Sequence, residues 1–496
     1  MEKKPFEYVK PEEAGIPSRA IIRYLNAIRR QRICLHSLLI IRGGKIAYEA
    51  NWAPMHSTQK HRMYSVSKSF VSVAIGLLAS EGKISLDDPV IKYFPDKATA
   101  YPGDYKAKAT IRDMLKMSSL FDVQPYDGAK DLDWISCFFN TKPDHESGMV
   151  HCYDTMATVL CTAIVERVSG QKLLDYLRPR LLDPIGFSED AWCVETPCGL
   201  SWAGSGIMCT TRDLAKFANV VMHGGEYEGK QLLPADYIRE ATSYQISNMV
   251  NDNSIQQGYG YQFWRFPENG FGCVGMGSQL AVCLPDRDLI LVTTGDTQEL
   301  EARQYAAFHL FYDLVLPEIE DEPVAAVPKD VEELKERTEG LVLQLTPGME
   351  DHPVCRKADG VLYRMDTNPL GWTQVRFTFD AEDASGTVHY TNARGEKEIQ
   401  FGFGKQVIGE FPETHYSGRR ISEPKGTGYR YAASAGWDTA GALTVYCYII
   451  DDYFGTLKMT FAFSQDGRDM TLYASKVAEW FLDDYVGTAS GHAVDA

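Results

Sequence analysis

A serine and a lysine three residues apart, Ser65 and Lys68, open a strongly apolar stretch of the chain. Residues at this spacing lie on one face of a helix, within side-chain reach of each other. A serine hydroxyl is a weak nucleophile that needs a neighbouring base, and a lysine amine can be that base once burial lowers its proton affinity. The pair therefore predicts acyl transfer. The competing interpretation is that Ser65 only caps the helix and that the lysine is incidental.

The same spacing occurs elsewhere in the chain, so sequence context must decide which pair is reactive. Ser65 precedes the apolar run from Phe70 to Leu78, which we expect to be a buried helix, and the N-terminus of a helix favours negative charge. The other pairs lie at helix ends, in a polar connection or in a loop with proline and glycine: Ser57/Lys60, Ser80/Lys83, Ser169/Lys172 and Ser422/Lys425. We therefore expect Ser65 and Lys68 to be the reactive pair.

Two later segments could complete such a site. Tyr153 precedes a second apolar helix, expected over about 155–168, and is a candidate for proton transfer, although core packing is the commoner role of such a tyrosine. Residues 274–279 have the sequence Val-Gly-Met-Gly-Ser-Gln, whose small residues let a substrate approach the backbone closely. A plain turn into the following strand explains that segment equally well.

The composition limits the class of protein. The 496 residues are too many for one ordinary domain, and 44% hydrophobic with 24% charged residues is typical of globular proteins. A formal net charge of −17 argues against nucleic acid or an anionic membrane as a partner. The N-terminus lacks an apolar signal core, no apolar run has the length of a membrane span, and the 11 cysteines include no Cys-x-x-Cys pair. We therefore expect a cytoplasmic protein with unpaired thiols and no metal site.

Two architectures follow each other along the chain. Residues 37–52 have the pattern of a hairpin around Gly43-Gly44, and strand-like runs return between 258 and 295, with apolar helices between. This order predicts an α/β (α+β) domain over residues 1–317, an antiparallel sheet flanked by helices. Residues 318–331 are acidic, contain two prolines and resemble a linker. Residues 332–496 alternate short strands with turns, which predicts an all-β barrel or sandwich of unknown role.

The order of the motifs resembles that of the serine β-lactamase-like family. This family includes class C β-lactamases, D,D-peptidases, D-aminopeptidases, family VIII carboxylesterases and 6-aminohexanoate-dimer hydrolases, and the resemblance covers roughly residues 10–316. Tyr64-Ser65-Val66-Ser67-Lys68 is similar to the first motif of the family. Tyr153-Asp154-Thr155 falls where the family carries Tyr-x-Asn, and Gly275-Met276-Gly277 falls where it carries Lys-Thr-Gly or His-x-Gly. Residues 84–90, 110–115, 204–208 and 211–214 are similar to its intervening stretches.

The resemblance implies a β-lactamase/transpeptidase-like fold and acyl transfer without a cofactor. Ser65 would attack a carbonyl, and Lys68 and Tyr153 would share the proton transfers, either of them as the general base. The backbone N–H groups of Ser65 and Ser278 would form the oxyanion hole. The expected substrate-binding positions are Thr155, Gly275 and Gly277.

Two departures from the family's motifs affect the expected substrate. Thr155 replaces an asparagine, and Gly275 replaces a cation or imidazole that helps to hold a substrate carboxylate. We therefore expect hydrolysis of a neutral ester or amide, unless a cation such as Arg265 reaches the site from another loop. The alternatives are a D-amino-acid peptidase that takes short peptides, a weak β-lactamase, or a catalytically idle binding protein of the same fold. The sequence leaves the oligomeric state open.

Overall fold

The computed structural model describes residues 4–97, 103–122, 133–248, 257–299, 304–413, 429–478 and 480–494. The chain divides into two units. The first is built mainly from Met1–Asn51 and His56–Leu341, and the second from Trp52–Met55, Val342–Arg419 and Glu423–Ala496. Within the described residues, no helix combines the length and the hydrophobicity that crossing a membrane requires.

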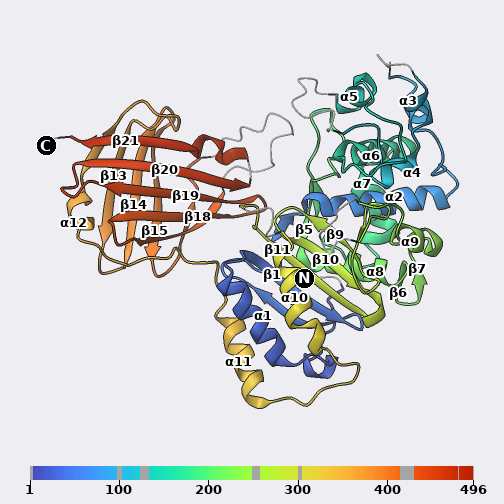
Figure 1. Cartoon of the computed structure of the whole chain (residues 1–496), viewed down its shortest axis with the longest axis horizontal. Coiled ribbons are helices and arrows are strands. Elements are labelled where there is room, and N and C mark those ends of the chain that lie inside the picture. Colours follow the sequence, from blue (N-terminus) through green and yellow to red (C-terminus); the bar gives the residue numbers. More distant parts are fainter. Residues whose placement is uncertain are drawn as a thin grey trace. The chain divides into compact units, whose positions relative to one another are not determined.

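An antiparallel sheet with the strand order β2-β1-β11-β10-β9-β8 forms the centre of the first unit (Figure 1). The early hairpin turns at Gly43 and Gly44, whose φ angles of 58° and 69° suit glycine. Leu39 in β1 faces Val292 in β11, so segments from the two ends of this unit lie side by side, as the sequence predicted. The strands are β1 (Leu35–Arg42), β2 (Lys45–Asn51), β8 (Trp264–Arg265), β9 (Phe271–Gly275), β10 (Gln279–Leu284) and β11 (Leu289–Gly295).

Helices pack on this sheet and on one another. α8 contacts β1, β10 and β11, α1 contacts α10 and α11, and α2 packs against α6, which also contacts α4 and α5. The helices are α1 (Ser18–Arg30), α2 (Ser67–Ser80), α3 (Asp104–Lys108), α4 (Ile111–Leu115), α5 (Trp134–Asn140), α6 (Thr155–Ser169), α7 (Leu173–Leu177), α8 (Thr211–Met222), α9 (Ala235–Ala241), α10 (Ala306–Leu314) and α11 (Pro328–Glu339). Short strands complete the unit: β3 (Lys60–Arg62), β4 (Trp192–Cys193), β5 (Ile207–Thr210), β6 (Glu226–Tyr227) and β7 (Lys230–Gln231).

The segment 318–331, expected to be a linker, contains the start of α11, which begins at Pro328. The Glu320 N–H donates to the Gly15 carbonyl at 2.9 Å, which ties this segment to the N-terminal part of the chain. In α11, Arg337 donates to the Asn26 side chain of α1 at 2.7 Å. The first unit therefore continues to Leu341.

Two helices of the first unit are buried from their first residues. Every residue from Ser67 to Leu78 in α2 is buried, and so is every residue from Thr155 to Val165 in α6. A helix that is apolar on all sides is stable only inside a protein. Gly170, with φ 71°, ends α6 as a left-handed C-cap, as its sequence predicted. The rigid, buried bodies of both helices therefore fix the side chains at their N-termini.

The second unit is a closed β-barrel (Figure 1). Its strands follow the order β15-β14-β13-β12-β21-β20-β19-β18-β17, β17 pairs back with β15, and β16 adds to β17. This closure decides between the barrel and the sandwich that the sequence left open. The strands are β12 (Leu362–Met365), β13 (Gln374–Asp380), β14 (Ser385–Asn392), β15 (Gly395–Phe403), β16 (Val407–Glu410), β17 (Arg430–Trp437), β18 (Ala442–Ile450), β19 (Phe454–Phe463), β20 (Asp469–Ala478) and β21 (Gly487–Ala493), with the short helix α12 (Cys355–Ala358) before them.

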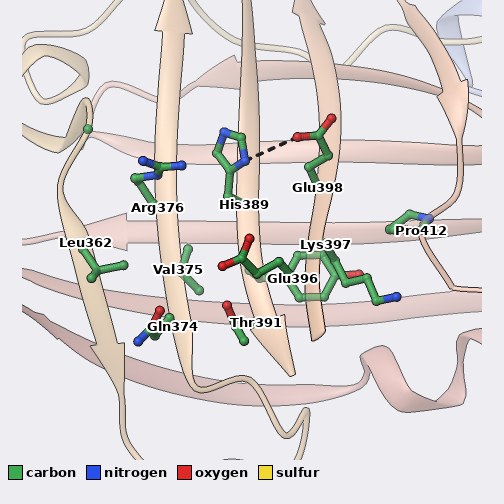
Figure 2. A pocket seen from close by; sticks show the side chains of 12 residues that line it. Leu362, Gln374, Val375, Arg376, His389, Thr391, Glu396, Lys397, Glu398 and Pro412 are labelled. Carbon is green, nitrogen blue, oxygen red and sulfur yellow. Dashed lines mark ion pairs between the residues drawn. The ribbon is translucent and has the colours of Figure 1, made fainter. Parts of the chain in front are cut away.

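A groove of about 720 Å³ lies on this barrel (Figure 2). Charged side chains from β13, β14 and β15 line it, including Arg376 and an ion pair between His389 and Glu398 at 3.5 Å. Its lining residues include no serine or cysteine. Among the described residues, the groove therefore has neither a serine nor a cysteine that could serve as the nucleophile of acyl transfer.

Candidate active site

Ser65 and Lys68 meet at the start of α2. Ser65 lies in a 3-10 turn (Tyr64–Val66), and Lys68 lies in the first turn of α2. Lys68 Nζ is 3.0 Å from Ser65 Oγ, and it donates to the Gly204 carbonyl at 2.6 Å. Ser65 is partly exposed, whereas Lys68 is 1% exposed. The cluster thus combines an accessible hydroxyl with a buried amine.

The other Ser-x-x-Lys pairs within the described residues direct their lysines to carboxylates. These ion pairs are Lys60–Asp190 at 2.5 Å, Lys83–Glu81 at 2.7 Å and Lys172–Glu195 at 3.2 Å. Ser422 and Lys425 lie outside the described residues. Among the described pairs, Ser65 and Lys68 therefore make the hydrogen bond that a nucleophile needs with its base.

Burial changes the proton affinity of Lys68. Desolvation lowers the pKa of Lys68 to about 7, and the Asp154 carboxylate opposes part of this effect. An ordinary lysine, with a pKa of about 10.4, is almost fully protonated at neutral pH. A substantial fraction of the Lys68 amines is therefore neutral at that pH and able to accept a proton.

Tyr153 joins this cluster from the start of α6. Its hydroxyl is hydrogen-bonded with that of Ser65, and Lys68 Nζ lies over its ring, 5.1 Å from the centroid. The Trp264 ring stacks on the Tyr153 ring with centroids 5.6 Å apart, which restrains the tyrosine. Desolvation raises the pKa of Tyr153, so its phenol stays protonated at neutral pH. The structure thus brings the three expected catalytic side chains together.

Asp154 is a buried carboxylate that the motif comparison did not single out. It is 1% exposed, its Oδ1 accepts the Met156 N–H at 2.8 Å, and its Oδ2 accepts the Ser119 hydroxyl at 2.9 Å. Burial raises the pKa of Asp154 to about 6. The signal for its capping role was present in the sequence, because aspartate is a favoured residue directly before a helix.

The glycine-rich segment between β9 and β10 lies against the turn that carries Ser65. A Cβ atom on Gly275 would be 2.3 Å from the Met63 carbonyl oxygen and 3.2 Å from the Val66 nitrogen. Both neighbours are backbone atoms, so they cannot move aside as a side chain could. Only glycine therefore fits at position 275, where β9 packs against this turn, so the side chain that carries the family's cation has no room there.

The expected oxyanion donor Ser278 follows in the same turn. Gly277 and Ser278 have φ angles of 82° and 72°, in the left-handed region. The Ser278 hydroxyl is within 2.8 Å of the Thr297 hydroxyl and donates to the Gln304 carbonyl at 2.9 Å. These hydrogen bonds tie the Ser278 side chain to Thr297 and Gln304 and so restrain the turn.

Thr155 lies next to the loop that holds Lys68. It is buried as the first residue of α6, and a Cβ atom on Gly204 would lie 2.5 Å from Thr155 Cγ2. Gly204 is the residue whose carbonyl accepts from Lys68. Thr155 thus packs at the edge of the cluster, and its role toward a substrate stays a prediction.

Two arginines near the cluster in the sequence have protein partners. Arg265 donates to the Thr242 carbonyl at 2.7 Å and to the Asn269 side chain at 3.1 Å. Arg62 is 4% exposed, lies between two aromatic rings at 4.7 Å from each, and donates to the Ser205 carbonyl at 3.1 Å. Both guanidinium groups are therefore bound to protein groups, and neither replaces the substrate-binding cation that the family carries at the position of Gly275.

The family model described as Beta-lactamase matches residues 22–310, more than half of the chain. The chain belongs to the beta-lactamase family. Within the described residues of this family member, no group of three His, Cys, Asp or Glu side chains is arranged to hold a metal ion.

Individual relatives agree with this assignment. The 6-aminohexanoate-dimer hydrolase of Paenarthrobacter ureafaciens is 23% identical over 341 residues, which cover 61% of this chain and 84% of that protein. A Bacillus anthracis structure provisionally named as the same hydrolase has a TM-score of 0.52 at 19% identity and covers 63% of this chain and 86% of its own. A penicillin-binding protein homologue from Caulobacter crescentus has a TM-score of 0.50 at 17% identity, covering 62% and 100%. These two structures support the fold of the first unit.

Proposed function

We propose that this beta-lactamase-family chain is a serine hydrolase that cleaves an ester or amide bond through an acyl-enzyme on Ser65. One observation carries the proposal: a buried Lys68 amine lies 3.0 Å from Ser65 Oγ, and burial lowers the pKa of Lys68 to about 7. Proton transfer is most effective when the pKa of the base lies near the working pH. An idle binding protein would have no need of a partly deprotonated amine beside an accessible hydroxyl.

The directions in which burial shifts the pKa values of Lys68 and Tyr153 support different roles for the two groups. Lys68 takes the Ser65 proton as Oγ attacks the carbonyl carbon, and the N–H groups of Ser65 and Ser278 stabilise the oxyanion. Tyr153, which is protonated at neutral pH, gives its proton to the leaving group, and Lys68 then passes the proton that it took from Ser65 to the Tyr153 oxygen, so that both groups return to their starting states. Water then attacks the acyl-enzyme, its proton passes to Lys68, and Ser65 leaves with a proton.

A neutral, partly apolar substrate fits the surroundings of this cluster. Gly275 offers no cation, and Arg62 and Arg265 are engaged with protein groups. Apolar side chains are exposed in the segments next to the expected site residues, with Met276 at 46% and Met149 at 78%. The Paenarthrobacter ureafaciens relative is named for an amide of an amino acid, so amides are the second class of substrate to test.

We expect a fluorophosphonate probe to label Ser65, because the probe reacts with serines that a neighbouring base activates. Mass spectrometry of the digested protein should find the label on the peptide that contains Ser65, and Ser65→Ala should abolish labelling. Ser80→Ala is a matched control, since Ser80 has the same spacing to a lysine that instead pairs with Glu81. Label on another residue, or full labelling of Ser65→Ala, would contradict the proposal.

We also expect faster hydrolysis of neutral esters than of substrates with a carboxylate. A cation on that carboxylate contributes about 1.5–3 kcal/mol, or more than tenfold in kcat/KM, and Gly275 cannot provide it. The measurement compares p-nitrophenyl butyrate, a chromogenic cephalosporin, a D-Ala-D-Ala peptide and 6-aminohexanoate dimer.

The matching gain-of-function variant is Met276→Lys. A lysine cannot be placed at position 275, because any side chain there would collide with the Met63 carbonyl. The neighbouring position 276 is exposed and can carry one. Met276→Lys should raise kcat/KM for the carboxylate substrates, whereas Met276→Gln, of similar length but neutral, should not. A wild-type preference for the carboxylate substrates would contradict the prediction.

A further inference from the structure

Asp154 carries a charge that its hydrogen-bond partners do not neutralise. The donors to its carboxylate, namely the Ser119 hydroxyl and the N–H groups of Met156 and Ala157, are uncharged groups. The side chain is 1% exposed, so water does not screen it effectively. An anion in such a place acts on charges around it more strongly than a surface carboxylate does.

A buried cation close to this charge is Lys68, whose Nζ lies 5.1 Å from the ring centroid of Tyr153, the residue next to Asp154. Attraction between the two raises the pKa of Lys68 and lowers the pKa of Asp154, while desolvation acts on each in the opposite direction. Lys68 is also 1% exposed. Because both groups are buried, removal of either charge is expected to change the proton affinity of the other.

Apart from the Arg62 guanidinium, which donates to the Ser205 carbonyl next to Gly204, the titratable groups around this pair are neutral near pH 7. Desolvation raises the pKa values of Tyr153 and Tyr259, and burial with neighbouring carboxylates raises that of the Cys152 thiol. The adjoining turn and loops contribute uncharged groups to the pair, namely the Ser65 and Ser119 hydroxyls and the Gly204 carbonyl. Among these groups, Asp154 is the anion that acts on Lys68.

Hydrogen bonds to two different segments hold Asp154 in this position. Asp154 is the N-cap of α6, and the bond from Ser119 joins it to the segment after α4. Two residues earlier, the Cys152 N–H donates to the Met117 carbonyl at 2.7 Å. Tyr153 lies between these two anchored residues, so the same contacts fix its backbone.

We infer that Asp154 is a positioning residue whose negative charge sets the pH range in which Lys68 acts as the base, while its hydrogen bonds fix the start of α6 beside Tyr153. This inference rests on the proposed function. Burial alone would leave Lys68 neutral over a wider pH range but would make it a weaker base toward the Ser65 hydroxyl. The carboxylate keeps the amine basic enough to take that proton.

The test is the pH dependence of Ser65 phosphonylation by a fluorophosphonate, which requires no natural substrate. Asp154→Asn keeps one oxygen for the Met156 N–H, and so a good N-cap, and its NH2 group can donate to the Ser119 hydroxyl, but it lacks the charge. Without the nearby anion, the protonated form of Lys68 is less stable, so the amine loses its proton at lower pH. The half-maximal pH of the labelling rate should therefore fall by about one pH unit.

Asp213→Asn is the matched control. Asp213 is 2% exposed and belongs to the N-terminal capping box of α8, where it accepts from Thr210 and from the Ser188 N–H at 2.8 Å. This variant should lose stability without a change in the half-maximal pH. A shift of equal size in Asp213→Asn would overturn the inference, because the effect would then not be specific to Asp154.

A second variant keeps the inference testable if Asp154→Asn does not fold, as judged by circular dichroism. Ser119→Ala removes one donor to the carboxylate, which is then protonated more often, so the half-maximal pH should fall by a smaller amount. A folded Asp154→Asn protein, or a folded Ser119→Ala protein in its place, with the wild-type half-maximal pH would overturn the inference. Absence of Ser65 labelling in the wild-type protein at every pH would instead overturn the proposed function.

Discussion

Replacing Lys68 with alanine is expected to lower kcat by roughly 10²–10⁴-fold, because the Ser65 hydroxyl then keeps its proton. Lys68 Nζ lies 3.0 Å from Ser65 Oγ, and its amine is partly neutral at neutral pH. Lys68→Met, which fills the same space without an amine, should lose as much activity as Lys68→Ala. Steady-state kinetics with p-nitrophenyl butyrate measure the loss, and circular dichroism checks that both variants are folded.

Lys68→Arg tests whether the site needs Lys68 as a proton acceptor or only as a positive charge. Arginine keeps the positive charge but stays protonated, so it should not restore activity. In the wild-type enzyme, protonation of Lys68 below a pH of about 7 should reduce kcat/KM toward acid pH, and the rate should rise with pH through that value. Wild-type activity in Lys68→Arg would show that the lysine does not act as a base.

The positions of the site residues could be predicted because each lies where a visible sequence pattern begins or ends. Ser65 precedes the apolar helix α2, Tyr153 precedes the apolar helix α6, and Gly275 lies shortly before the strand β10. The order of the motifs was enough to indicate the family, and the order of the strands and helices was enough to predict an antiparallel sheet flanked by helices. The catalytic roles of the site residues stay predictions until the variants are measured.

Other features depend on contacts that local patterns do not encode. Alternating strands are compatible with a barrel or a sandwich, and only the pairing of β17 with β15 closes the barrel. The sequence named burial as the condition for Lys68 to act as a base, but the contacts that bury it, with Gly204 and the Tyr153 ring, come from distant parts of the chain. The same holds for Gly275, whose close approach to the Met63 carbonyl joins segments far apart in the chain.

Replacing Tyr153 with phenylalanine is expected to lower kcat by roughly 10²–10⁴-fold for an alkyl ester or amide, because such leaving groups need a proton. p-Nitrophenolate leaves without one, so the loss for p-nitrophenyl butyrate should be smaller. The variant keeps the ring that stacks on Trp264 and removes only the hydroxyl bonded to Ser65. Tyr259→Phe, in the adjacent ring 6.4 Å away, is the control and should retain activity with both substrates. Equal losses with both leaving groups would mean that Tyr153 assists the attack of Ser65 rather than the departure of the leaving group, and wild-type rates would remove it from the mechanism.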